Sequence, residues 1–149
     1  MTPAGLDLSV LHAALAPDHP EHEPARGIVR FLATGLAAVA MPCTVPAALA
    51  MALVRDGADP DWARERARDL LSMARLLGVD EADAIQALAH GDDDEPEVLL
   101  AAAAFRRHGV TLVVTAAEHR RGYRDCGVET VLSIAEADRQ VDVLIGGGV

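Results

Sequence analysis

Hydrophobic and polar positions follow two different periods along the chain, and each period predicts one kind of element. Short apolar runs predict strands at residues 5–10, 37–41, 111–115 and 129–132. Apolar positions three and four residues apart predict helices at about 18–34, 44–55, 59–75 with a continuation over 81–89, 96–108 and 134–139. Strands that alternate with helices are typical of an α/β fold, here a three-layer sandwich around a central, mostly parallel sheet.

Helix boundaries come from residues that favour the ends of helices. Asp18 is the expected N-cap of the first helix, and Gly35 is expected to end it. Thr44 and Pro96 stand where two later helices are expected to begin. The apolar positions of the helix after residue 59 extend as far as Leu77, which we therefore expect on its buried face.

The 149 residues predict one domain over residues 1–140, followed by an apolar, glycine-rich C-terminal tail at 141–149. The uncharged segment 31–54 is long enough to cross a bilayer, but Gly35, Pro42 and Pro46 divide it into shorter elements. We therefore expect no membrane span. The absence of a basic N-terminal region and of a disulfide pattern predicts a cytoplasmic protein with two reduced thiols.

The charge of the chain argues against general affinity for nucleic acid. The formal net charge is −10, so contact with RNA needs a local basic patch or a bridging metal. The best candidate patch flanks the strand at 111–115 and consists of Arg106, Arg107, Arg120, Arg121 and Arg124. Phosphate contact is one interpretation of these arginines, and an ordinary solvated surface is the other.

Carboxylates at two places suggest a site for a hard metal ion. Asp7 lies in an apolar run, where a carboxylate is costly unless it is paired or bound to a metal. The acidic run 91–97 ends at Glu97 in the first turn of a predicted helix, near the strand ends where α/β sheets bind ligands. The alternatives are that Asp7 caps a local turn and that the acidic run is a solvated loop with a favourable helix start.

Four segments, in order, carry a resemblance to a known family. They are LDLSVL, VAMPCTVPAALAMALV, EVLLAAAAFRRHGVTLVVT and GVETVLSIAEA. Between Leu6 and about Arg139 the chain resembles the PIN-domain family, in particular the VapC-type toxins of type II toxin–antitoxin systems. The resemblance implies a PIN-like fold for residues 1–140 and a Mg²⁺- or Mn²⁺-dependent endoribonuclease that uses four acids to hold the metal.

Only part of that acidic set is present in this chain. The first acid corresponds to Asp7, and the third corresponds to Glu97. The second falls on Ala48, and the fourth falls on Ala117, with Glu118 one residue beyond as a possible substitute. Because these acids act as a unit, the loss of two predicts weak or altered activity.

Two hypotheses follow from this incomplete set. In the first, the chain is a hydrolase of RNA, with Asp7 and Glu97 as catalytic residues. The metal ligands are then Asp7, Glu97 and Glu118, and the substrate-binding residues are Ser9, Thr115, Arg120 and Arg121. In the second, the chain is an inactive PIN-fold module that binds an antitoxin or its own copy. The family resemblance also implies a homodimer.

Overall fold

The computed structural model describes residues 3–35, 37–90 and 95–141. The described strands are β1 (Ala4–Leu6), β2 (Val39–Pro42), β3 (Arg75–Leu77), β4 (Leu112–Thr115) and β5 (Thr130–Ser133). The helices are α1 (Leu8–Leu15), α2 (His22–Ala33), α3 (Val45–Arg55), α4 (Pro60–Met73), α5 (Glu81–Ala89), α6 (Pro96–Arg107), α7 (Arg120–Asp125) and α8 (Ile134–Arg139), with a 3₁₀ turn, η1 (Ala117–His119).

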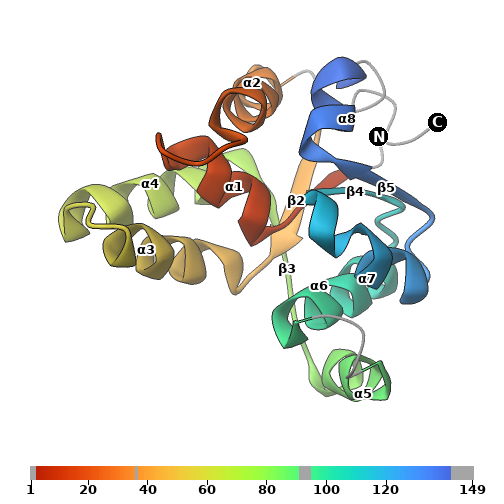
Figure 1. Cartoon of the computed structure of the whole chain (residues 1–149). Coiled ribbons are helices and arrows are strands. Elements are labelled where there is room, and N and C mark those ends of the chain that lie inside the picture. Colours follow the sequence, from red (N-terminus) through yellow and green to blue (C-terminus); the bar gives the residue numbers. More distant parts are fainter. Residues whose placement is uncertain (1–2, 36, 91–94, 142–149) are drawn as a thin grey trace.

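The strands form one sheet in the order β3-β2-β1-β4-β5, and every pairing is parallel. Helices cover both faces of this sheet, so the expected α/β three-layer sandwich is confirmed (Figure 1). In this arrangement β1 lies at the centre of the sheet, and the residue that follows it is enclosed by neighbouring strands on both sides.

Alternating side chains of the strands divide the interior into two hydrophobic cores. Leu6, Met41 and Val114 belong to the core shared with α1, α2, α3, α4 and α8. Val113 and Val131 belong to the core shared with α6 and α7. Successive strand residues point to opposite faces, so a strand covered on both sides is apolar throughout, as β4 is.

Gly5 shows how closely the second core is packed against the sheet. A Cβ atom at Gly5 would lie 2.7 Å from the ring of Phe105 in α6, which is closer than carbon atoms can approach. Phe105 is fully buried, so the ring has little room to move away. Glycine at this position therefore allows α6 to lie directly on the central strand.

The first strand is shorter than expected because Asp7 ends it. Residues 5–10 were predicted as one strand, but β1 ends at Leu6 and α1 begins at Leu8. The Asp7 carboxylate accepts a hydrogen bond from the backbone N–H of Ser9 and acts as the N-cap of α1. The expected helix start at Asp18 is also wrong, since α2 begins at His22.

The sequence pattern also missed β3. The helix predicted over 59–75 ends at Met73, and Ala74 turns the chain into an extended conformation. Leu77, expected on the helix, lies in β3 and is buried beside β2. Its spacing from the apolar residues of α4 fits a helix by coincidence, and the pairing with β2 decides the conformation.

Further comparisons between prediction and structure concern residues 117–125, the uncharged segment 31–54, the acidic run and the C-terminal tail. Residues 117–125, for which no element was predicted, form η1 and α7. The segment 31–54 contains the end of α2, β2 and α3, and within the described ranges no helix is long and apolar enough to cross a membrane. Most of the acidic run, 91–94, and residues 142–149 of the expected tail lie outside the described residues.

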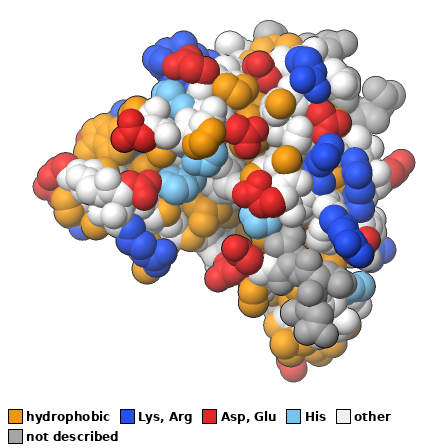
Figure 2. All heavy atoms as spheres, viewed as in Figure 1, with side chains coloured by type: hydrophobic (Ala, Val, Ile, Leu, Met, Phe, Trp, Pro, Cys, Tyr) orange, Lys and Arg blue, Asp and Glu red, His pale blue; other side chains and the backbone are white. Residues whose placement is uncertain are grey.

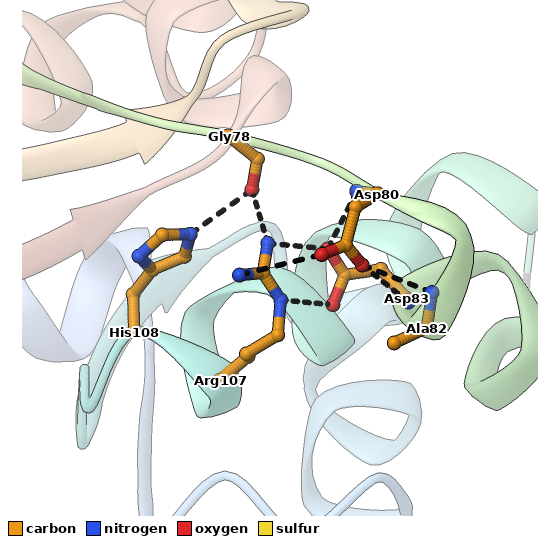
Figure 3. A network of polar contacts seen from close by, with 6 residues as sticks. All are labelled: Gly78, Asp80, Ala82, Asp83, Arg107 and His108. Carbon is orange, nitrogen blue, oxygen red and sulfur yellow. Dashed lines mark hydrogen bonds and ion pairs between the residues drawn. The ribbon is translucent and has the colours of Figure 1, made fainter.

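A buried ion pair fastens α5 to α6 and to the end of β3 (Figure 3). The side chain of Asp83 is almost fully buried and accepts two hydrogen bonds of 3.0 Å from the Arg107 guanidinium. Arg107 also donates to the carbonyl of Gly78 at 2.7 Å. Asp83 additionally accepts from the N–H of Asp80, which completes a capping box at the start of α5.

We predict that Asp83→Asn lowers the free energy of unfolding by about 1.5–3 kcal/mol, the range for hydrogen bonds to charged groups. Urea unfolding at neutral pH measures this change. The exposed pair Arg64–Asp61 offers a matched control, because Asp61→Asn breaks an ion pair that is open to water. Equal losses in the two variants would contradict the importance of the buried pair.

The same pair predicts a dependence of stability on pH. Hydrogen bonds from Arg107 hold the pKa of the Asp83 carboxyl below its ordinary value, although burial acts in the opposite direction. The stabilisation is therefore complete above the unfolded value of about 3.9 and is lost as the pH falls through the lower folded pKa. Unfolding measured from neutral to acidic pH should show this loss in the wild type and a smaller one in Asp83→Asn.

Candidate functional site

Asp7 occupies the point where the central strand of the sheet meets α1. It follows β1 directly, and only 5% of its surface is exposed to solvent. Strands β2 and β4 lie on either side of β1, so their carboxyl ends surround this residue. Open parallel sheets bind ligands at this edge.

Four hydrogen bonds from neighbouring groups reach the Asp7 carboxylate. Oδ1 accepts from the backbone N–H of Ser9 at 3.0 Å and from the Ser9 hydroxyl at 2.5 Å. Oδ2 accepts from the Thr115 hydroxyl at 2.5 Å and from the Tyr123 hydroxyl at 2.9 Å. Asp7 therefore joins α1, β4 and α7 through one buried group.

The Ser9 hydroxyl takes part in a second hydrogen bond of this network. The Ser9 hydroxyl, which donates its proton to Asp7, accepts a hydrogen bond of 3.0 Å from the N–H of Ala116. A carboxylate has about four acceptor positions on its two oxygens. All four donors to Asp7 are groups of the protein, so the carboxylate is saturated without a metal ion.

A hollow of about 330 Å³ lies beside Asp7 at the carboxyl ends of the strands. We call it the carboxyl-end hollow, and it is lined by Asp7, Leu8, Ser9, His12, Pro42, Thr44, Val45, Ala48, Val79, Glu95, Glu97, Val98, Leu100, Ala101, His119 and Tyr123. Most of these side chains are apolar. The hollow thus brings together Asp7, Ser9 and Glu97, three of the residues proposed from the sequence, and Ala48 also lines it.

Glu97 differs from Asp7 in its surroundings. It stands in the first turn of α6, its side chain is exposed, and it makes no hydrogen bond or ion pair with any described residue. Glu118 lies on η1, where it is exposed and does not line the hollow. The structure therefore places two of the three predicted metal ligands at the hollow and the third outside it.

The arginines predicted to contact substrate lie elsewhere and are held by the fold. Arg120 pairs with Glu136, and Arg121 lies 3.4 Å from Asp125. Neither arginine lines the hollow. The backbone N–H of Ser133, its hydroxyl and then Arg120 donate hydrogen bonds that hold the pKa of the Glu136 carboxyl below its ordinary value.

The other arginines of the predicted patch also have partners within the fold. Arg106 donates to the carbonyl of Cys126 at 3.1 Å, and Arg124 donates to the carbonyl of Val131 at 3.4 Å. Arg107 is held by the buried Asp83. Most of the cluster is thus engaged in ties between elements, and Arg121, with 87% of its side chain exposed, is the member most open to solvent.

Two residues at the hollow were missed by reasoning from the sequence. Tyr123 is fully buried and donates to Asp7, and it is the only tyrosine of the chain. A single tyrosine near a predicted strand end was the available signal, because a buried tyrosine needs a partner for its hydroxyl. His12 lines the hollow and lies 2.5 Å from Asp56, the residue after α3, a contact that only folding creates.

The site and the comparisons together define a class and no particular family. Within the residues that the structure describes, no group of three or more His, Cys, Asp or Glu side chains is placed to hold a metal ion. No family model matches the chain, and no curated protein matches it. What is established is an α/β sandwich with a buried, saturated carboxylate beside an apolar hollow.

We predict that Thr115→Val lowers the free energy of unfolding by about 1.5–3 kcal/mol, because valine keeps the shape but removes a donor to a charged group. Chemical denaturation measures the change. Thr130→Val is the matched control, since Thr130 is a half-buried strand residue with no part in the Asp7 network. Similar effects of the two substitutions would contradict the proposed cost of leaving Asp7 with three donors.

Proposed function

We propose that the chain is a PIN-like domain that has lost metal-dependent hydrolysis and acts by binding a protein partner. The observation that carries this proposal is the saturation of Asp7 by four donors of the protein. A carboxylate whose acceptor positions are filled has to give up hydrogen bonds before it can ligate a metal ion. Those bonds hold α1, β4 and α7 together, so metal binding would oppose the fold.

The residues around Asp7 support the same conclusion. A nuclease of the PIN type uses several carboxylates to hold a metal ion and activate water, and the expected positions here include Ala48 and Ala117. Ala48 presents only a methyl group to the hollow. Glu97 remains as an exposed acid, and one or two carboxylates hold Mg²⁺ only when water and substrate phosphates complete its coordination.

An exposed apolar stripe supports a role in protein binding. Ala47, Met51 and Val54 follow one another on α3 at intervals of four and three residues, and all three are exposed. Met51 is 58% exposed although it is a large hydrophobic side chain. Hydrophobic side chains are also visible over the α3–α4 pair at the left of Figure 2. Contiguous apolar surface of this kind marks interaction sites.

A metal-dependent endoribonuclease that uses Mg²⁺ or Mn²⁺ is the second candidate. One observation favours it: Asp7 and Glu97 line the same hollow at the carboxyl ends of the strands. In that case a metal ion would bind between them, and RNA would supply the remaining oxygen ligands. The two candidates differ in whether the unmodified chain binds a divalent metal, which makes metal binding the deciding measurement.

We predict that the wild type shows no calorimetric binding of Mn²⁺ at millimolar concentration and cleaves no RNA, whereas a variant with Ala48→Glu and Ala117→Asp binds Mn²⁺. The two substitutions restore acids at the positions that the family resemblance assigns to them. The double variant with Ala47→Glu and Ala117→Asp is the matched control. It has the same composition, but Ala47 does not line the hollow.

Binding of Mn²⁺ by the wild type, abolished by both Asp7→Ala and Glu97→Ala, would overturn the proposal in favour of the nuclease. Equal metal binding by the restored variant and its control would show that these positions do not form a site. Circular dichroism of each variant establishes that a loss of binding does not come from unfolding.

For the protein partner, we predict that the wild type associates with a second copy through α3 and that Met51→Glu shifts the equilibrium at least about tenfold toward monomer. A charge that is buried without a partner in an apolar interface is costly. Sedimentation equilibrium measures the dissociation constant. Ala84→Glu, on the exposed surface of α5, adds the same charge as a control. A monomeric wild type would exclude self-association as the function.

A further inference from the structure

The carboxyl-end hollow combines two features that the proposed protein binding does not use. Its volume of about 330 Å³ lies near the lower end of the range of about 300–1,000 Å³ found for small-molecule sites. Its walls are largely apolar, with the partly exposed Leu8 from α1, Ala48 from α3 and Leu100 from α6 in front of the buried Val45 and Val98. Apolar walls favour a ligand with an apolar body, because both surfaces leave water when they meet.

Among the described residues that line the hollow, the charged groups other than the histidines have one sign. They are the carboxylates of Asp7, Glu95 and Glu97, which stand there together with His12 and His119, and no arginine belongs to this described set. Figure 2 shows pale-blue and orange side chains in the hollowed middle of this face, with acidic side chains around them and several arginines to the right. A hollow of this charge disfavours phosphates and other anions.

Glu97 is the carboxylate best placed to meet a ligand. Asp7 is buried and saturated, whereas Glu97 is exposed and forms no hydrogen bond or ion pair with a described residue. Its neighbour Val98 is buried and lines the same hollow. Adjacent residues of α6 therefore supply a charged group at the mouth of the hollow and part of its apolar wall.

We infer that the carboxyl-end hollow binds a small organic cation, an amine whose charge meets Glu97 at the mouth and whose apolar body lies against Leu8 and Leu100. This inference rests on the proposed function in one respect, since a metal ion held by Asp7 and Glu97 would neutralise the charge that attracts the amine. A hydrated divalent ion fits the apolar walls poorly, because it keeps its water.

The test compares three probes of nearly the same shape and different charge: phenethylammonium, phenylpropanol and phenylpropanoate. Calorimetric titration of the full chain should show the cation binding about tenfold more tightly than the anion, with the neutral probe between them. Added salt should reduce the difference, since Glu97 is exposed. Equal affinity for the three probes would overturn the inference.

Two substitutions locate the site. Glu97→Gln should weaken phenethylammonium binding about two- to fivefold, the range expected for an exposed ion pair, whereas Glu65→Gln on α4 should leave it unchanged. Ala48→Phe should abolish binding by filling the hollow, whereas Ala47→Phe, outside the hollow, should not. Unchanged binding in Glu97→Gln would overturn the inference even if Ala48→Phe fails to fold.

The Mn²⁺ titration separates this inference from the proposed function. Wild-type protein that binds neither Mn²⁺ nor phenethylammonium contradicts the cation site alone. Wild-type protein that binds Mn²⁺ through Asp7 and Glu97 contradicts the proposed function, and competition between Mn²⁺ and phenethylammonium then shows whether the two ligands share the hollow.

Discussion

The hydrogen bonding of one buried carboxylate is the constraint on which the carboxyl edge of this sheet depends. A buried carboxylate is costly unless each of its acceptor positions is filled. Ser9, Thr115 and Tyr123 supply the donors to Asp7, and they come from α1, β4 and α7. The need to satisfy Asp7 thus fixes the relative positions of three elements that are far apart in the sequence.

The same constraint connects the fold to the function. In a metal site, the metal ion satisfies part of each carboxylate, and the protein needs fewer donors. Here the protein fills the acceptor positions itself, and Ala48 stands in the hollow where another acid would be expected. This edge of the sheet is an apolar pocket with acidic side chains at its lining, and the proposed binding function rests on that combination.

The elements that were predicted correctly are those whose sequence signals lie within a few neighbouring residues. The run at 111–115 is β-branched and apolar, so β4 was found within one residue, and the bounds of α8 were found as predicted. α1 was not predicted at all, because its first residues were assigned to the strand at 5–10, and the capping by Asp7 decides their conformation. β3 was missed because it is short and partly exposed, and pairing with β2 stabilises it.

The residues of the candidate site also differ in whether the sequence alone could indicate them. Asp7 could be proposed from the sequence because a carboxylate in an apolar run is costly without a partner, and Glu97 because it stands in the first turn of a predicted helix near strand ends. Ser9 and Thr115 were proposed from the family resemblance. Tyr123 and His12 could not be proposed from the sequence, because their contacts with Asp7 and Asp56 join residues separated by 116 and 44 positions. The arginine cluster was misleading for the same reason, since the acids that engage Arg107 and Arg120 lie outside it in the sequence.

The sequence by itself determined the α/β class and the positions of most helices. These follow from periodicity and residue type, which act over a few residues. The tertiary structure alone decided that Asp7 is saturated, that Glu97 is exposed at an apolar hollow, and that Glu118 lies outside it. Hydrogen-bond saturation and the shape of a cavity depend on atoms from several elements, and only the packed chain brings those atoms together.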